Sequence, residues 1–375
     1  MTNHAYFTMD TLQIGEKMSK PICKIADIIF VRFELVDLAP QREYLEHFGM
    51  FLAYATEETI FYRGTGTAPY CYVATKGNTN RHIGTAYRAN AFSDLEALAA
   101  AKGVEIVENT EPGGGHKVTI VDPDNIEIEV YFGMEVAEPI TVDPKMLNTG
   151  VDKPRANVQQ RFGRGSDEWQ LHNDRWVYEL TSKVKRLGHT AINVADAAVS
   201  VDWYAKTLGF LISDNLIGPD GESSIGAFMR CDQGDMPVDH HTLNNVQIMG
   251  EPRAAFGHAG YEVTDSVDDL MAGHYHMKTV DKYYHEWGIG RHLLGSQMYD
   301  YWRDPTGFTH EHWTDGDLLD ASIPPSDTPA RDLIMAQYGP EIPASFGASM
   351  PSEDVDRFRS VTPSLSDLVK MMEQQ

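Results

Sequence analysis

A histidine, a tyrosine and a glutamate stand close together in the segment from Gly290 to Trp313, which reads GRHLLGSQMYDYWRDPTGFTHEHW. They are His292, Tyr301 and Glu311. The Asp-Pro-Thr-Gly run is a strong turn signal, because proline presets φ and glycine tolerates a left-handed position. The segment therefore predicts two short strands joined by a turn. A carboxylate just past such a turn could be a metal ligand with acid–base neighbours, or the strands could form a hydrated hairpin.

The composition limits the classes of function. The chain has 375 residues, 42% of them hydrophobic, and a formal net charge of -24. This length favours two domains with tails. The excess of negative charge argues against nucleic-acid binding, because phosphates would be repelled. The sequence has no apolar run of membrane-spanning length and no apolar N-terminal core typical of a signal peptide, so we expect no membrane partner.

Three cysteines bear on the compartment. Cys23, Cys71 and Cys231 are odd in number, widely spaced and absent from any CxxC pattern. A disulfide framework or a zinc knuckle would need paired spacing. We interpret the cysteines as buried free thiols in a reducing cytoplasm.

The order of predicted elements recurs along the chain. Runs in the first half match runs in the second, with residues 28–50 corresponding to 187–210, 81–103 to 256–277, and the hairpin 118–132 to the hairpin 299–313. Each run reads as a strand, an amphipathic helix and further strands. A repeat fixes the architecture. We therefore predict an α+β fold in which four βαβββ modules pair into two half-open barrel domains.

The repeat also sets the expected boundaries. They are an N-terminal arm at 1–23, an N-terminal domain without metal at 24–135, a linker at 136–185, a catalytic domain at 186–316 and a C-terminal tail at 317–375 that wraps the domain or a neighbouring subunit. Exposed sheet edges and this tail predict a homo-oligomer, a dimer or tetramer. In the helix after residue 90, Ser93 is the expected N-cap and Gly103 the C-cap. The run LSDLVKMM at 365–372 has a faint helical pattern.

Aligning the modules puts three potential metal ligands at matching strand positions. His189 lies in the first strand of the third module, His258 in the first strand of the fourth, and Glu311 in the last strand. Two imidazoles and one carboxylate leave adjacent coordination positions open, which is characteristic of non-haem Fe(II) oxygenases. A lone histidine in a strand is more often a satisfied core residue. Three ligands at repeat-equivalent positions favour a metal site.

The first half serves as an internal control for this alignment. Its equivalent positions are Phe30, Gly84 and Glu129. Only the carboxylate remains there, so we expect the second half alone to hold metal.

The segments LGHTAINV, GHAGYEV and DPTGFTHEHW resemble the ligand segments of type I extradiol ring-cleaving dioxygenases, in the vicinal oxygen chelate superfamily. The resemblance covers residues 24–316 at the level of the fold and is strong over 186–316. That family also has a histidine before the second ligand, matched in VDHHTLN, where His241 aligns better than His240. Its Gly-Arg-His segment, with a tyrosine nine residues after the histidine and the glutamate ten further on, is matched by His292, Tyr301 and Glu311 with the spacing intact.

The resemblance implies a function and a set of roles. It implies an Fe(II) centre (Mn(II) is possible with the same ligands) that takes a catechol and O2 and gives a ring-opened semialdehyde or keto acid. His241 would act as acid and base, because an imidazole can take and return a proton near neutral pH. Tyr301 would hydrogen-bond the chelated oxygen of the substrate, and His292 would hold the other oxygen.

Some neighbouring residues are not expected to take part. His240, His310 and His312 are three of them; the last two flank Glu311, so strand alternation points them to the other face. Some family members that bind carboxylated catechols have an arginine where this chain has Trp287, which indicates a less anionic substrate.

Three alternatives stay open. A hydroxyphenylpyruvate-type α-keto-acid dioxygenase would share the ligands and the two-domain build without needing the acid–base set. A glyoxalase-type isomerase or lyase would use Ni, Zn or Mn without O2. A metal-free binding protein of the bleomycin-resistance type would lack the ligands altogether.

Overall fold

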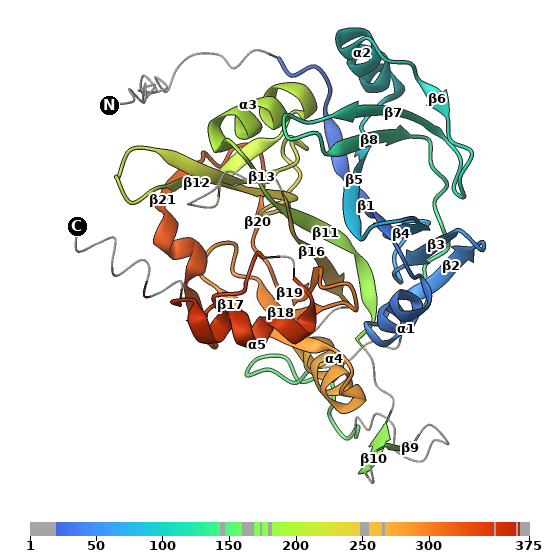
Figure 1. Ribbon diagram of the computed structural model, residues 1–375, viewed down its shortest axis with the longest axis vertical. Helices are drawn as coiled ribbons and strands as arrows, with labels where there is room; N and C mark the ends of the chain where they lie inside the picture. The colour runs from blue at the N-terminus through green and yellow to red at the C-terminus, as the bar shows by residue number, and fades with distance from the viewer. Residues whose placement is uncertain are drawn as a thin grey trace.

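Two large β-sheets make up most of the fold of the computed structural model (Figure 1). The structure describes residues 20–142, 147–159, 169–172, 175–178, 182–247, 255–264, 267–348, 350–364 and 367. The eight-stranded sheet has the order β2-β3-β4-β1-β5-β8-β7-β6. Its strands are β1 (Ile25–Leu35), β2 (Phe51–Ala55), β3 (Thr59–Arg63), β4 (Tyr72–Lys76), β5 (Arg81–Ala89), β6 (Val107–Glu108), β7 (His116–Val121) and β8 (Glu127–Phe132). Helices α1 (Ala39–His47) and α2 (Phe92–Lys102) belong to this half.

The ten-stranded sheet has the order β21-β12-β13-β15-β11-β16-β19-β18-β17-β22. Its strands are β11 (Val184–Asn193), β12 (Leu211–Ile217), β13 (Ser224–Arg230), β15 (Leu243–Val246), β16 (Ala255–Val263), β17 (Tyr284–His292), β18 (Met298–Arg303), β19 (Thr309–Thr314), β21 (Ser326–Pro329) and β22 (Ala336–Tyr338). The helices of this half are α3 (Ala197–Leu208), α4 (Val267–Val280), η1 (Ala330–Ile334) and α5 (Ser352–Val361). Two small pairs complete the described strands, β9 (Trp169–His172) with β10 (Arg175–Tyr178), and β14 (Val238–Asp239) with β20 (Leu318–Leu319).

The predicted repeat is visible in the order of the strands. The inner eight strands of the second sheet, β12-β13-β15-β11-β16-β19-β18-β17, follow the same connectivity as the whole first sheet. The register agrees as well, because Val31 pairs with Thr85 in one half and Thr190 with Ala259 in the other. The predicted α+β fold of paired modules is therefore confirmed.

The C-terminal segment adds the two outermost strands of the second sheet. β21 pairs in parallel with β12, and β22 pairs antiparallel with β17. Helix α5 is fastened beside them, since Tyr284 of β17 donates a hydrogen bond of 2.7 Å to Asp356. The sequence predicted an extended tail, and its weak periodicity did not indicate these short strands or α5. The run LSDLVKMM lies outside the described residues except for Asp367.

The predicted N-cap of α2 is wrong by two residues. The helix begins at Phe92, so Ser93 lies inside it and Ala91 is the N-cap. Ala91 cannot cap with its own side chain; instead its backbone N–H donates to Asp94 at 2.9 Å. The predicted C-cap is confirmed, because Gly103 has a left-handed φ of 67°.

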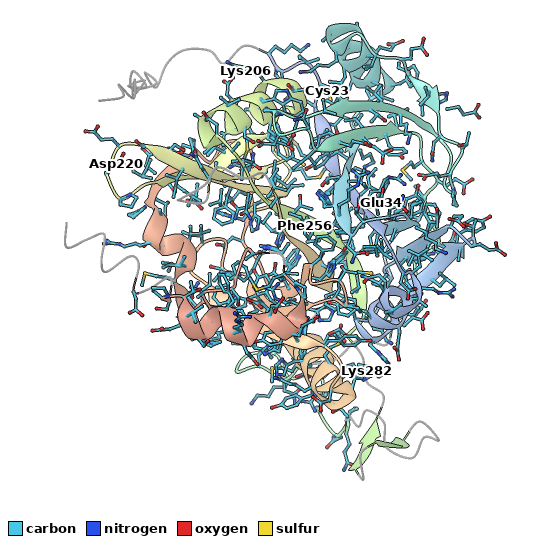
Figure 2. All side chains as sticks on the ribbon, viewed as in Figure 1. Cys23, Glu34, Lys206, Asp220, Phe256 and Lys282 are labelled. Carbon is cyan, nitrogen blue, oxygen red and sulfur yellow. The ribbon has the colours of Figure 1, made fainter. Side chains whose placement is uncertain are left out.

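The two halves share one hydrophobic core. Phe33 of β1 packs against Phe256 of β16 and against Phe308, with ring centroids 5.2 and 5.0 Å apart. Figure 2 shows Phe256 in the middle of the molecule, where the two halves meet. Burying aromatic rings from both halves in one cluster stabilises their association.

The three cysteines are buried free thiols, as predicted. Burial raises the pKa of Cys23 and of Cys71 to about 12, which keeps both thiols protonated and unreactive. None of the helices among the described residues is long and apolar enough to cross a membrane.

His310 and His312 point away from Glu311, toward the first half, as strand alternation predicted. His310 Nε2 lies 3.1 Å from Asp304 Oδ2. The His312 ring stacks on Phe48 at 3.6 Å, and its Nε2 donates to the Phe48 carbonyl oxygen at 2.7 Å. Both histidines therefore belong to the contact between the two halves.

Acid should weaken the fold through His312. Burial lowers the pKa of this fully buried ring to about 4, although Asp300 partly opposes the shift. The folded state stays neutral while the unfolded chain takes up a proton from about pH 6.5 downward, so stability falls as the pH drops from about 6.5 to 4. Between pH 7 and 5 we expect the wild type to lose about 2 kcal/mol more than His312→Gln, measured by urea unfolding. His116→Gln, the same substitution at an exposed histidine, is the matched control. Equal losses in His312→Gln and the wild type would contradict this assignment.

Candidate metal centre

Three adjacent strands of the second sheet position the predicted ligands. β11, β16 and β19 lie side by side, and Gly260 of β16 pairs with His189 on one side and Glu311 on the other. His258 stands two residues before Gly260, so it projects from the same face of the sheet. A Cβ at position 260 would lie 2.2 Å from His189 Cε1, so the glycine makes room for the imidazole. In the sequence, a glycine two residues after the second predicted ligand indicates that a neighbouring side chain needs this space. Sequence reasoning missed this indication.

The three predicted ligands converge. His189 Nε2 lies 2.9 Å from Glu311 Oε2 and 3.3 Å from His258 Nε2, and His258 Nε2 lies 3.6 Å from the same oxygen. All three side chains are buried, Glu311 completely. The sequence placed these residues 69 and 53 positions apart (189 to 258 and 258 to 311), and the fold brings their ligand atoms within 4.8 Å of one another.

The chemistry of this donor set fits a cation. Burial lowers the pKa of His258 to about 3, a shift that Glu311 only partly opposes, so the ring is neutral near pH 7 and its lone pair is available. Burial raises the pKa of Glu311, but His189, His292 and His258 together outweigh burial, so the net pKa is lowered and the carboxylate remains ionised. A buried carboxylate needs a compensating charge. A divalent ion between the three donors would supply that charge and accept both imidazole lone pairs.

The predicted acid–base residues surround the same point. His292 Nε2 and Tyr301 Oη are 2.8 Å apart, and His292 Nε2 lies 3.8 Å from Glu311 Oε1. The Tyr301 ring is 5.1 Å from the His258 ring, and the His241 ring is 4.4 Å from the His189 ring. The structure thus brings all six residues predicted for the site together, and their individual roles stay predictions.

His241 has a supporting chain of side chains behind it. His240 Nδ1 lies 3.2 Å from His241 Nδ1, and His240 Nε2 lies 2.7 Å from Asp214 Oδ2. Burial raises the pKa of Asp214, but hydrogen bonds from His240 and from Ser326 and Thr328 of β21 outweigh it, so the net pKa is lowered. His240 therefore lies behind His241 and does not face the triad. Sequence reasoning missed Asp214, because a single aspartate on an unremarkable strand carries no signal.

A wall of aromatic side chains adjoins the triad. Trp287 stacks on Tyr301 at 5.5 Å with an interplanar angle of 11°, and Tyr299 lies 4.0 Å from the His292 ring. Phe346, from the C-terminal segment, contacts Tyr301 at 4.9 Å and the His258 ring at 5.7 Å. Phe346 was also missed, since nothing in its local sequence indicates that the segment returns to the site.

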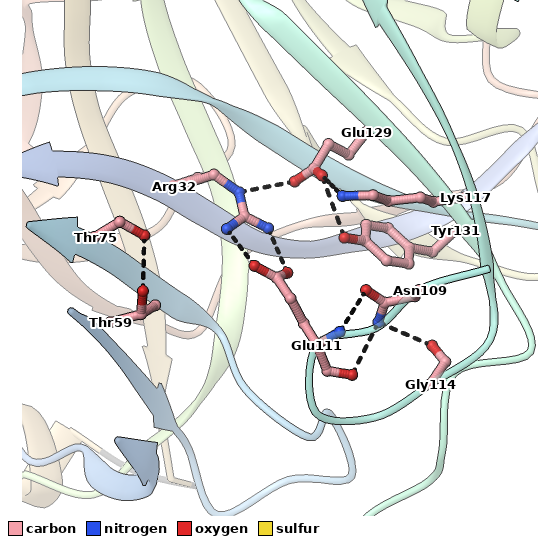
Figure 3. A network of polar contacts seen from close by, with 9 residues as sticks. All are labelled: Arg32, Thr59, Thr75, Asn109, Glu111, Gly114, Lys117, Glu129 and Tyr131. Carbon is pink, nitrogen blue, oxygen red and sulfur yellow. Dashed lines mark hydrogen bonds and ion pairs between the residues drawn. The ribbon is translucent and has the colours of Figure 1, made fainter. Parts of the chain in front are cut away.

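The repeat-equivalent place in the first half is filled by protein cations (Figure 3). Glu129 pairs with Ala86 as Glu311 pairs with Gly260. Arg32 Nε donates to Glu129 at 3.0 Å, Lys117 forms a second ion pair with it, and Arg32 also holds Glu111 through two hydrogen bonds of 2.7 and 2.9 Å. The negative charge of Glu129 is therefore already balanced by Arg32 and Lys117.

The other two equivalent positions also differ from a metal site. Phe30 is fully buried, and a Cβ at Gly84 would lie 1.9 Å from the Glu127 carbonyl oxygen. No histidine fits at Gly84 without a backbone shift. The two halves share a fold but have different polar chemistry at the matching place.

The sequence of the second half matches a known family. Residues 186–311 match the Glyoxalase/Bleomycin resistance protein/Dioxygenase superfamily. This agrees with the superfamily that the ligand segments resemble.

Particular relatives extend the similarity to most of the chain. Metapyrocatechase 2 of Cupriavidus necator is 25% identical over 332 residues, which are 88% of this chain and 93% of that protein. Among solved structures, the Mn(II)-bound glyoxalase from Novosphingobium aromaticivorans has a TM-score of 0.66 at 21% identity and covers 88% of this chain and 96% of its own. A variant of homoprotocatechuate 2,3-dioxygenase from Brevibacterium fuscum has a TM-score of 0.62 at 19% identity, covering 82% and 76%. These structures share the fold.

Proposed function

We propose that the protein cleaves the ring of a catechol with O2, outside the two hydroxyl groups, at an Fe(II) ion held by His189, His258 and Glu311. The observation that carries the proposal is the placement of His241, His292 and Tyr301 around these three residues. A catechol offers two adjacent oxygens, and three protein ligands leave room for both and for O2. Similarity to Metapyrocatechase 2 supports the same reaction class. When bound, the metal would supply Lewis acidity and electron transfer between catechol and O2.

The hydrogen bonds behind His241 support Nε2 as the nitrogen that acts on the substrate. If His240 Nε2–H donates to Asp214, then His240 Nδ1 accepts from His241 Nδ1–H, and the lone pair of His241 Nε2 is left free. Burial lowers the pKa of His241 well below its ordinary value, so the ring is neutral and able to accept a proton. His241 would take the proton that the catechol loses on binding and return it when the O–O bond breaks.

Tyr301 would act as a hydrogen-bond donor. Burial raises its pKa well above the ordinary value, and the charge of Glu311 adds to the shift, so the phenol stays protonated. If His292 Nε2–H donates to Tyr301 Oη, the phenol hydrogen is free to donate to a substrate oxygen. The pair would thus orient the catechol before any bond is made.

The aromatic wall supports an uncharged ring as the substrate. Trp287 is 3% exposed, and its indole N–H donates to the Pro340 carbonyl oxygen at 2.9 Å, so the ring presents an apolar face rather than a polar group. Tyr299, Tyr301 and Phe346 extend this face. We propose a catechol that is unsubstituted or carries an apolar substituent.

Anaerobic loading with Fe(II) followed by catechol and O2 tests the function. We expect O2 uptake with a yellow ring-opened chromophore, and higher kcat/KM for alkyl-substituted than for carboxylated catechols. Loading with Mn(II) in parallel tests the choice of metal. The likeness to the Mn(II)-bound glyoxalase keeps an O2-independent isomerase as the second candidate. Metal binding without catechol turnover or O2 uptake would reject the dioxygenase.

Replacing His241 with asparagine should lower kcat by roughly 10²–10⁴-fold, the usual contribution of a general acid–base. Iron content should not change, because the metal is held by the other side chains. His116→Asn, at an exposed histidine in the first half, is the matched control and should keep wild-type kcat. If His241→Asn keeps kcat and changes only KM, the residue positions substrate and does not move a proton.

We also propose that the protein assembles into a homo-oligomer. Edge strand β2 of the first sheet exposes Leu52 and Tyr54, which are 43% and 49% accessible. Exposed apolar side chains on a sheet edge favour pairing with another copy. Sedimentation velocity would measure the mass of the assembly, and a monomer at micromolar concentration would reject this assignment.

A further inference from the structure

A second cluster of metal-binding side chains lies on the other face of the hairpin that carries Tyr301. In β18, Tyr299 and Tyr301 face the triad, so the intervening Asp300 faces helix α4. There His274 of α4 and His285 of β17 meet Asp300. None of these three residues has a part in the proposed reaction.

The geometry of this cluster is compact. His274 Nδ1 lies 3.0 Å and His285 Nε2 lies 2.7 Å from the same oxygen, Asp300 Oδ1. Trp302 Nε1 donates to the other carboxylate oxygen at 2.6 Å and so fixes its orientation. Asp300 is completely buried, whereas the two histidine side chains are 14% and 17% exposed, which leaves a path from solvent.

The cluster matches the first triad in composition and in spacing. Both sets consist of two histidines and one carboxylate whose ligand atoms lie within 4.8 Å of one another. In both, a buried carboxylate oxygen is the common neighbour of two imidazole nitrogens, at 2.9 and 3.6 Å in the triad and at 3.0 and 2.7 Å here. Bonds of about 2.1 Å to a tetrahedral ion separate ligands by roughly 3.4 Å. Shifts of less than about 1 Å would therefore admit the ion.

We propose that His274, His285 and Asp300 form a second site for a divalent transition-metal ion of the Zn²⁺ class. Two imidazoles and one carboxylate suit such an ion, and a water would take the fourth position through the exposed ring edges. Each histidine would move its proton to the other ring nitrogen and give its lone pair to the ion. The indole N–H of Trp302 would remain on the carboxylate as an outer hydrogen bond of the kind that orients metal ligands.

Such an ion would cross-link α4 to the hairpin of β17 and β18. That hairpin carries His292 and Tyr301 on its opposite face. The second ion would therefore restrict the movement of the strands that position these two side chains. The proposal does not depend on the reaction catalysed at the first site.

Metal counting on the folded, tag-free protein tests the site. After chelation, the wild type is equilibrated with Zn²⁺, dialysed and analysed for bound metal and by isothermal titration. We expect two equivalents for the wild type, and one for each of His274→Gln, His285→Gln and the triad variant His258→Gln. His276→Gln, on the same helix but outside the cluster, should keep two. Thermal unfolding shows that each variant is folded.

Anomalous diffraction at the zinc edge from wild-type crystals needs no variant. A peak between His274, His285 and Asp300, in addition to one at the triad, is the expected result. A single peak at the triad, with His285 Nε2 still at hydrogen-bond distance from Asp300, would overturn the proposal. So would an unchanged count of two equivalents in His274→Gln.

Discussion

We expect Glu311→Gln to abolish the iron binding proposed at this site and to reduce O2 uptake with catechol to background. The amide removes the carboxylate charge that would offset a divalent ion, and the neutral His258 ring cannot replace it. Loss of an outer-shell partner alone typically costs about 10–100-fold in metal affinity or activity, and loss of a direct ligand should exceed the upper end of that range. Iron content after dialysis and initial O2 uptake rates measure the effect. Both measurements are made in protein that also carries His274→Gln, so that metal bound at the second cluster does not add to the measured iron content.

The repeat offers a matched control for this change. Glu129→Gln is the same substitution at the equivalent strand position, where the carboxylate holds Arg32 and Lys117. Iron content and activity should stay at wild-type values, while stability falls because two partly buried cations lose a partner. If Glu311→Gln keeps both iron and activity, the proposed metal centre is wrong.

Replacing Arg303 with methionine will destabilise the second half by about 3–5 kcal/mol, the usual result of breaking a buried ion pair from one side. Arg303 Nε donates to Glu286 at 2.6 Å, and neither side chain is exposed. The guanidinium also donates to the carbonyl oxygens of Ser345, Gly307 and Ala348. Urea unfolding gives the free-energy change. Hydrogen exchange should show loss of protection over residues 342–348, and KM for catechol should rise because Phe346 is released.

A surface arginine gives the comparison. Arg81 pairs with Glu34 at 3.0 Å, but its side chain is 59% exposed. Exposed pairs contribute about 0–1 kcal/mol, so Arg81→Met should change the free energy of unfolding by no more than that. Equal losses in Arg81→Met and Arg303→Met would mean that burial does not govern the contribution of these pairs.

The repeated modules and the convergence of the three candidate ligands could be predicted because both leave local signals. Strand and helix periodicities recur with the same order, and the alignment that they define brings His189, His258 and Glu311 to one place. In the structure, cross-strand pairing brings these residues together, because Gly260 pairs with His189 on one side and with Glu311 on the other. Where function rests on such periodic positions, the sequence contains the necessary information.

The supporting residues could not be predicted, because their partners are distant in the chain. Asp214 reaches His240 only after β12 takes its place in the sheet, and its own partners come from β21, more than one hundred residues later. Phe346 comes from a segment whose composition indicates a loop. Ser93 is not the N-cap, because the helix begins one residue before it, at Phe92. The N-cap is Ala91, whose backbone N–H donates to the Asp94 side chain. Asp214 and Phe346 depend on tertiary contacts, which no local pattern encodes, whereas the contact between Ala91 and Asp94 is local and was simply not recognised in the sequence.

The C-terminal strands place a limit on when the protein can mature. β21 and β22 close opposite edges of the second sheet, and the carbonyl oxygens of Ser345, Ala348 and Met350 accept hydrogen bonds from Arg303. They are synthesised after the strands whose edges they cover, whereas the first half is synthesised early and can fold early. Until β21 and β22 have left the ribosome, the nascent second sheet has two open edges, which are templates for pairing with other chains. The second sheet is therefore completed only after these two strands are made, and a chain truncated near residue 316 is expected to aggregate.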